Sequence, residues 1–343
     1  MSRILVTAFA LSAALAASVL MTPALAAEYK IADRISVPDG GWDYITSDPE
    51  HGRIYRTRTD GADVIDVKTH KVSQLKNTGN GHMVVPVAGT TLAVLPLRTP
   101  PKTIRIIDTA TDKVVADVPG GEAPDGATYD PFSKHVFVIN HNSSDVTEVD
   151  PVAGKAVGMI AIGGSKLEFA DSDGAGRVFV NVQERGEIAV IDVKGQKVAA
   201  TYKMPGCEGN SGLAYSGSKT KLLIAACGNG VAKVIAADDG KEVASIPIGK
   251  GPDSVIYDPQ RQLAFIPCGR DAVLEIISLA DAADVVLAQQ LPTHVLVRTG
   301  ALDPQSGRVY LMSAEPDASK PLGGGGRPTP KEGSFEMLVV GPQ

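Results

Sequence analysis

The sequence predicts an all-β fold, a seven-bladed β-propeller with four-stranded blades, and three periodic observations carry this prediction. Hydrophobic runs that end in Ile-Asp or a close variant recur about every 42 residues, at Asp66, Asp108, Asp150, Asp192, Ala236, Ser278 and, after a longer step, Val340. A turn of the Asp-Pro or Gly type lies upstream of each run, at Asp48, Ala88, Asp130, Asp173, Gly217, Asp258 and Asp303. A lysine follows five residues after the first five run ends, from Lys71 to Lys241. A fixed period of this length is typical of repeat architectures.

Each repeat divides into four strand-like runs separated by turn residues. In the third repeat the runs cover residues 126–129, 135–140, 146–149 and 156–162. A solenoid of the same period would need helices, and no repeat shows a 3.6-residue apolar pattern. Four short strands in such a repeat are typical of a propeller blade, which can bury its faces only against neighbouring blades.

The two ends of the chain predict how the ring closes. Residues 29–37 have the pattern of the fourth strand of a blade, but the first three strands of that blade do not precede them. The last repeat, in contrast, ends with its third strand, residues 335–340. We expect the N-terminal strand to complete the last blade, because this pairing leaves no unpaired sheet edge where the ring joins. Residues 28–343 are therefore predicted to form a single propeller domain.

Residues 1–27 have the pattern of a signal peptide that is removed on export. Arg3 is followed by an apolar stretch, residues 4–21, and then by the small-x-small pattern Ala24-Leu25-Ala26. No later segment is long and apolar enough for a membrane helix. We expect a periplasmic or secreted protein without a membrane span after cleavage.

The formal net charge of −6 limits the kinds of partner that the protein is expected to bind. An acidic chain is a poor match for the phosphate backbone of nucleic acids, so we expect no nucleic-acid partner. The partner is expected to be a small molecule or a periplasmic protein, and the propeller is expected to be a monomer.

Similar segments recur in the strands and in the loops that lead into them. They are Val136-Phe137-Val138-Ile139-Asn140, Val178-Phe179-Val180-Asn181, Ile107-Asp108-Thr109-Ala110-Thr111-Asp112-Lys113-Val114, Val190-Ile191-Asp192-Val193, Gly121-Glu122-Ala123-Pro124-Asp125-Gly126 and Gly249-Lys250-Gly251-Pro252-Asp253-Ser254. Through these segments essentially the whole mature chain resembles the YVTN-type β-propeller repeat family. The resemblance implies the fold rather than one activity. Similar repeats occur in surface-layer and periplasmic proteins, in lactonase-like and lyase-like enzymes, and beside quinone- or haem-linked oxidoreductases.

Repeat symmetry predicts a ring of side chains at one mouth of the central channel. Five residues before the turn markers stand Asp43, Met83, Asp125, Glu168, Gly212, Asp253 and Arg298, and His82 adjoins Met83. No cofactor motif is evident, but carboxylates and an imidazole can hold a divalent cation, with Asp125, Glu168, Asp253 and His82 as the candidate ligands. The alternative is that each Asp after Pro caps a tight turn.

Three histidines map to loops of the same face, His82, His141 and His294. They could bind zinc or supply an acid or base. Because they belong to different blades, no local spacing pairs any two of them. The candidate ligand-binding residues are therefore Asp43, His82, Asp125, Glu168, Asp253, His294 and Arg298.

Three cysteines, Cys207, Cys227 and Cys268, allow at most one intrachain disulfide. Antiparallel pairing brings the start of a blade's first strand near the end of its second. This geometry favours Cys207–Cys227 over Cys227–Cys268, although both remain open.

Two functions follow from these residues. The first is a binding or scaffold propeller, because no nucleophile–base motif is present and the candidate face is acidic. The second is a metal-assisted hydrolase or lyase of the lactonase-like kind, in which the cation polarises a carbonyl. In either case the Gly- and Pro-rich insertion at residues 315–333, on the same face, is predicted to be mobile and could cover the channel mouth.

Overall fold

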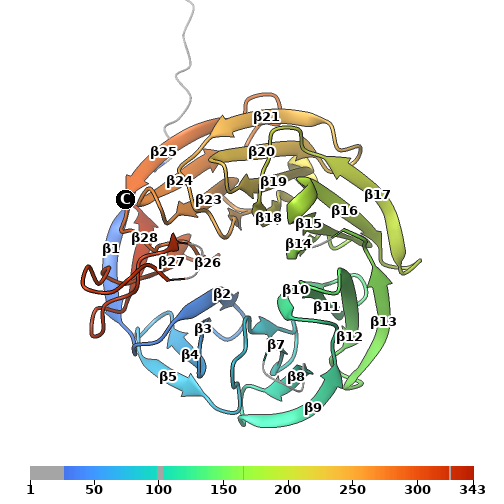
Figure 1. The fold of residues 1–343 in the computed structure, drawn as a ribbon, viewed down its shortest axis with the longest axis horizontal. Coiled ribbons are helices and arrows are strands. Elements are labelled where there is room, and N and C mark those ends of the chain that lie inside the picture. Colours follow the sequence, from blue (N-terminus) through green and yellow to red (C-terminus); the bar gives the residue numbers. More distant parts are fainter. Residues whose placement is uncertain (1–26, 99–102, 165, 324–325) are drawn as a thin grey trace, which may run out of the picture.

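A computed structural model describes residues 27–98, 103–164, 166–323 and 326–343. These residues form seven four-stranded antiparallel sheets arranged as a ring about a central axis (Figure 1). The seven-bladed propeller predicted from the repeats is therefore confirmed. The predicted signal peptide lies outside the described residues, apart from Ala27.

The first strand of each blade lies nearest the axis and later strands lie progressively outward (Figure 1). The first three blades contain β2 (Trp42–Asp48), β3 (Arg53–Arg58), β4 (Gly61–Asp66) and β5 (Val72–Leu75); β6 (Val85–Pro86), β7 (Leu92–Leu97), β8 (Thr103–Asp108) and β9 (Lys113–Pro119); and β10 (Pro124–Asp130), β11 (His135–Asn140), β12 (Asp145–Asp150) and β13 (Lys155–Ala161). The last four strands are those of the third repeat. Each lies within two residues of its predicted bounds.

The next three blades keep the same order. They contain β14 (Leu167–Ser172), β15 (Arg177–Val182), β16 (Glu187–Asp192) and β17 (Lys197–Lys203); β18 (Asn210–Tyr215), β19 (Leu222–Cys227), β20 (Val231–Ala236) and β21 (Glu242–Pro247); and β22 (Ile256–Asp258), β23 (Leu263–Cys268), β24 (Val273–Ser278) and β25 (Val286–Pro292). Two short helical turns, η1 (Gln183–Arg185) and α1 (Gly217–Thr220), lie between strands. Within the described residues no helix is long and apolar enough to cross a membrane.

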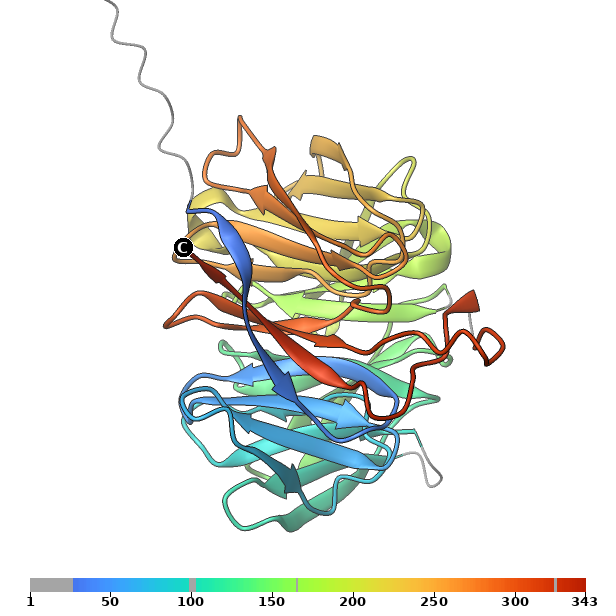
Figure 2. The same cartoon turned by 90° about the vertical axis from the view of Figure 1, so that its left-hand side faces the viewer.

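The seventh blade combines the two ends of the chain. It contains β26 (Gly300–Asp303), β27 (Arg308–Ser313), β28 (Glu336–Pro342) and, as its outermost strand, β1 (Tyr29–Ser36). β1 runs antiparallel to β28, with Ile31 opposite Val340 and Ile35 opposite Met337 (Figure 2).

The hydrophobic core lies between blades, because successive residues of a strand face opposite sides of a sheet. In β11, Val136 and Val138 pack against the second blade, whereas Phe137 and Ile139 pack against the fourth. All four side chains are fully buried. Burying each one stabilises the fold by roughly 1.5–3 kcal/mol, so the ring holds together through blade-to-blade contacts as well as through hydrogen bonds within blades.

A candidate cation site at the upper mouth

We call the end of the axis at which the inner strands begin the upper mouth, and the opposite end the lower mouth. Strand pairing identifies one equivalent residue of each blade at this mouth. In each blade the second residue of the second strand pairs with a residue of the inner strand, and the equivalent residue stands four positions before that partner in the sequence. The seven residues, which we call the upper ring, are Asp43, His82, Asp125, Glu168, Ser211, Asp253 and Arg298.

The upper ring differs at two positions from the one obtained by counting along the sequence. His82 and Ser211 stand where Met83 and Gly212 were expected, because the turns that follow β6 and β18 begin one residue earlier than their sequence markers. The Met83 side chain is buried instead, with its sulfur 3.3 Å from the Ala127 backbone nitrogen. Gly212 lies against the next blade, where a Cβ would come within 2.4 Å of the Ser254 carbonyl carbon.

Backbone irregularity explains why ring side chains can leave the blade interface. The pairing of the inner strand with the second strand shifts between Trp42 and Ile45 and between Pro124 and Ala127, and similar shifts occur in the fourth and fifth blades. A bulge of this kind redirects a side chain from its regular alternation. The residues within these shifts, including Asp43, Asp125 and Glu168, are therefore not held to the faces of their sheets.

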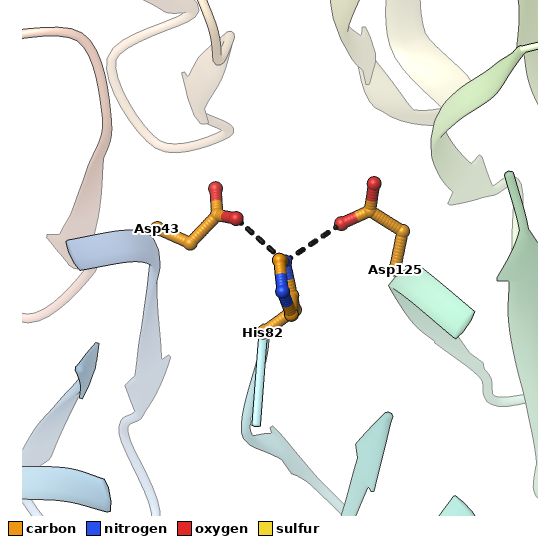
Figure 3. A group of neighbouring side chains, drawn as sticks. All are labelled: Asp43, His82 and Asp125. Carbon is orange, nitrogen blue, oxygen red and sulfur yellow. Dashed lines mark ion pairs between the residues drawn. The ribbon is translucent and has the colours of Figure 1, made fainter. Parts of the chain in front are cut away.

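The first cluster of the upper ring is formed by Asp43, His82 and Asp125 (Figure 3). The Nδ1 atom of His82 lies 2.6 Å from Asp43 Oδ2 and 3.1 Å from Asp125 Oδ1. Neither oxygen is aligned for a regular hydrogen bond with this buried nitrogen, so we interpret the contacts as ion pairs. Burial lowers the pKa of His82, but the two carboxylates outweigh burial and raise it to about 9.

The second cluster shares Asp125 with the first and adds His141 and Glu168. The Nδ1 atom of His141 lies 3.5 Å from Glu168 Oε1 and 3.8 Å from Asp125 Oδ2. The same nitrogen is 2.9 Å from the Leu167 carbonyl oxygen, a contact in which it would carry the proton and leave the lone pair on Nε2. Burial, together with repulsion from Asp125, Asp253 and Asp43, raises the pKa of Glu168 to about 8.

Asp125 therefore joins the two clusters and is almost fully buried. Burial acts to raise its pKa, but His82, Arg98 and His141 outweigh burial and hold the pKa below its ordinary value. The Arg98 guanidinium lies 2.5 Å from Asp125 Oδ2. At neutral pH the site thus contains an ionised Asp125 beside a protonated Glu168.

Asp253 lies elsewhere on the ring, among arginines. Its Oδ2 atom accepts hydrogen bonds from Arg298 Nε at 2.8 Å and from Arg327 Nη2 at 3.1 Å. Arg298 also donates to the Trp42 carbonyl oxygen and stacks over the Trp42 ring at 5.2 Å. Asp253, predicted as a cation ligand with Glu168 and His82, belongs to neither cluster. Arg327, from the predicted 315–333 insertion, reaches the ring.

His294, the remaining predicted site residue, lies apart from the upper ring. Its Nδ1 atom is 3.3 Å from Ser313 Oγ and 3.8 Å from Glu336 Oε1, at the start of β28. Its loop follows the outer strand β25, so it begins far from the axis.

The cysteines pair as the strand geometry favoured. Cys207 and Cys227 form a disulfide with Cα atoms 5.4 Å apart, and Cys268 is a free, buried thiol. The bridge joins the segment before β18 to the end of β19, at the upper mouth.

Several residues of the site are absent from the predicted set. Arg98 and His141 occupy equivalent positions, each directly after the second strand of its blade. His141 is predicted on this face but is not among the candidate ligand-binding residues, and applying the repeat to this position as well would have selected both residues. Ser211 could have been found from a corrected turn count, whereas Arg327 comes from an insertion that the repeat does not describe.

Comparison with known proteins supports the fold. No family model and no curated protein matches the chain. Among solved structures, the RRP9 WD40 repeats superpose with a TM-score of 0.77 at 10% identity, covering 91% of this chain and 100% of that one. Hydrazine synthase from Kuenenia stuttgartiensis gives a TM-score of 0.70 at 13% identity, covering 80% and 94%. At these identities the likeness shows a shared propeller fold alone.

Proposed function

We propose that this protein is an exported binding propeller whose upper mouth holds a divalent cation. The observation that carries the proposal is the convergence of Asp43, His82 and Asp125, whose donor atoms lie within 4.8 Å of one another. One ion could contact all three atoms at ordinary ligand distances. The signal-peptide pattern and the Cys207–Cys227 disulfide support export, because disulfides persist in oxidising compartments.

The charges of the metal-free site favour a cation. Two carboxylates face one imidazole, and that imidazole is held in its protonated form. Glu168 stays protonated because its burial and the neighbouring carboxylates both oppose a further negative charge at the site. A divalent ion could replace the His82 proton and allow Glu168 to ionise, so binding should release protons.

The ligand set favours a transition-metal dication over calcium. Imidazole with carboxylates suits Zn²⁺ or Mn²⁺, whereas Ca²⁺ is normally surrounded by oxygen ligands only. His82 supplies nitrogen to the first cluster and His141 can supply nitrogen to the second.

Calorimetric titration of chelator-treated protein with Zn²⁺, Mn²⁺ and Ca²⁺ tests the proposal. We expect saturable binding of Zn²⁺ or Mn²⁺ and weaker binding of Ca²⁺. An Asp284→Asn variant, which loses one exposed carboxylate remote from the site, is the matched control and should bind as the unaltered protein does. Failure of all three ions to bind at a defined stoichiometry would exclude the proposal.

A second candidate function is metal-assisted hydrolysis or elimination. It is favoured by a cavity of about 210 Å³ beside Asp253, which is lined in part by Arg270, Arg298 and Arg327. Such a cavity could hold an anionic group of a substrate while the cation polarises a carbonyl. Glu168, once the bound cation allows it to ionise, could then accept a proton from the attacking water or from the substrate as a general base. Lactone opening that requires added metal and is lost in Glu168→Gln would support this function.

A further inference from the structure

The lower mouth contains a separate cavity of about 510 Å³. The later residues of the inner strands form much of its wall. Six of the seven blades contribute, through Ser47, Pro86, Thr128, Asp171, Tyr215 and Tyr257. Met83 and Phe169 also line it, and Phe169 packs against the buried ring of Tyr44 at 5.5 Å. None of the upper-ring residues lines this cavity.

Aromatic side chains form much of the wall. Tyr129, Tyr215 and Tyr257 occupy equivalent positions in the third, fifth and sixth blades, each opposite the second residue of its second strand. All three are half-buried, so their rings pack against the blades while remaining accessible from the cavity. The volume lies within the range of small-molecule sites, about 300–1,000 Å³.

Asp171 is the only charged side chain among the described residues that line the cavity. Its Oδ2 atom accepts a hydrogen bond from the Tyr215 backbone N–H at 2.8 Å, and its Oδ1 atom accepts one from the Ser172 N–H at 2.8 Å. Each oxygen retains acceptor capacity. Burial outweighs these hydrogen bonds and raises the pKa of Asp171 to about 6, so the carboxylate is ionised at neutral pH.

The surrounding charges do not neutralise Asp171. Asp130 accepts a hydrogen bond from Ser172 Oγ, and Asp173 adds a second negative charge nearby. Asp173 is paired with Arg177, and Asp258, at the end of β22, is paired with Arg261. Among the described residues, Asp171 is therefore a carboxylate without an ion pair in a cavity that is otherwise uncharged and largely apolar and aromatic.

We infer that the lower mouth binds a small organic cation, with its ammonium group against Asp171 and its apolar body against the tyrosine rings. A carboxylate provides an ion pair and hydrogen-bond acceptors for an ammonium group. Aromatic faces attract the same charge and cover the apolar part of the ligand. A bare metal ion fits this cavity poorly, because a single carboxylate supplies too few ligands.

Benzylammonium and benzyl alcohol are matched probes, because they share a ring and differ in charge. With the full chain at pH 7.5 in the presence of a chelator, we expect calorimetry to show benzylammonium binding at least tenfold tighter than benzyl alcohol. Asp171→Asn keeps an oxygen for the Tyr215 N–H and should reduce benzylammonium affinity at least tenfold. Asp284→Asn, the control for charge loss, and Asp125→Asn, which alters only the upper mouth, should leave it unchanged.

A pH series on the unaltered protein provides a readout that does not depend on a variant. Benzylammonium affinity should be constant between about pH 7 and pH 8, where the probe stays charged, and fall below pH 6 as Asp171 is protonated. Equal affinity for the two probes would overturn the inference. So would unchanged benzylammonium binding in a folded Asp171→Asn protein, whereas a cation site that failed at the upper mouth would leave the inference intact.

Discussion

The two mouths of the channel are built from the same inner strands, yet they present different chemistry. At the upper mouth carboxylates, imidazoles and guanidinium groups contact one another, as in the Asp43–His82–Asp125 and Asp253–Arg298 groups. At the lower mouth one carboxylate, Asp171, stands in an apolar wall. The upper-mouth residues lie at bulges in four of the blades, whereas Asp171 and the three lower-mouth tyrosines lie in regularly paired strand. Local backbone irregularity thus allows one strand to carry two kinds of site.

The largest expected effect separates the two mouths by their ligands. Asp125→Asn should weaken Zn²⁺ or Mn²⁺ binding about 100-fold or more, because both cation clusters lose the carboxylate that they share. Benzylammonium binding should not change. Calorimetry with both ligands on Asp125→Asn and Asp171→Asn should give opposite patterns, and parallel losses would contradict the separation of the sites.

Removing the disulfide should lower the free energy of unfolding by about as much as a 100-fold loss of metal affinity represents. The bridge closes a loop between residues 20 apart at the upper mouth, and a loop of this size is worth about 3 kcal/mol. A Cys207→Ala/Cys227→Ala protein should unfold at lower urea concentration than Cys268→Ala under the same conditions. Benzylammonium affinity measured below the unfolding transition should be retained in both.

Stability should respond to pH in different windows at the two mouths. The folded-state pKa of Glu168 is raised from 4.5 to about 8, so the protonated form favours folding and stability is lost as pH rises through this interval. His82, raised from 6.5 to about 9, contributes stability below pH 6.5 that is lost as pH rises through 9. The pKa of Asp171 is raised from 3.8 to about 6, so the stability that its protonated form contributes is lost at lower pH, as pH rises through this interval.

Melting temperatures of the metal-free protein between pH 5 and 9 test these windows. The decline between pH 6 and 8 should be shallower in Glu168→Gln, whereas Asp171→Asn should change only the part below pH 6. Added Zn²⁺ or Mn²⁺ should offset the decline at high pH. Identical curves for the unaltered protein and Glu168→Gln would show that ionising the buried Glu168 beside the other carboxylates does not limit stability.

The smallest effect is expected from the insertion. Arg327 is half-exposed and shares Asp253 with Arg298, so Arg327→Ala should cost less than about 1 kcal/mol. Melting should shift by no more than about 4 °C. Arg298→Ala, which loses the Asp253 pair, the Trp42 hydrogen bond and the ring contact, should have the larger effect.

The sequence predicted the fold well because every blade repeats the same strands and turns. Periodicity also selected Asp43, Asp125, Glu168, Asp253 and Arg298, since each occupies the same position in its blade. In the second and fifth blades it selected the neighbouring residue, Met83 or Gly212, because the turn there begins one residue earlier than its sequence marker.

Contacts between blades were beyond the repeat pattern. Whether Asp125 meets His82 or an arginine depends on distances between blades, which a single sequence does not contain. The repeat did not predict Asp171, because the equivalent residues of the other blades carry no charge: Thr46, Val85, Thr128, Ala214, Ile256 and Ala301. A charged residue at a position that is uncharged in every other blade was the signal that could have identified it.

The closing contact of the ring has a consequence for the order of folding. β1 is among the first strands to be synthesised, but its partner β28 lies about 300 residues further along the chain, as in Ile31 and Val340. In six blades the strands that pair are neighbours in the sequence. In the seventh blade β1 can pair only after β28 has been synthesised, and this pairing closes a loop of nearly the whole chain at a large cost in conformational entropy. Ring closure is therefore expected to be the slow step. A chain truncated before β28 would leave β1 without a partner and its sheet edge open to other chains.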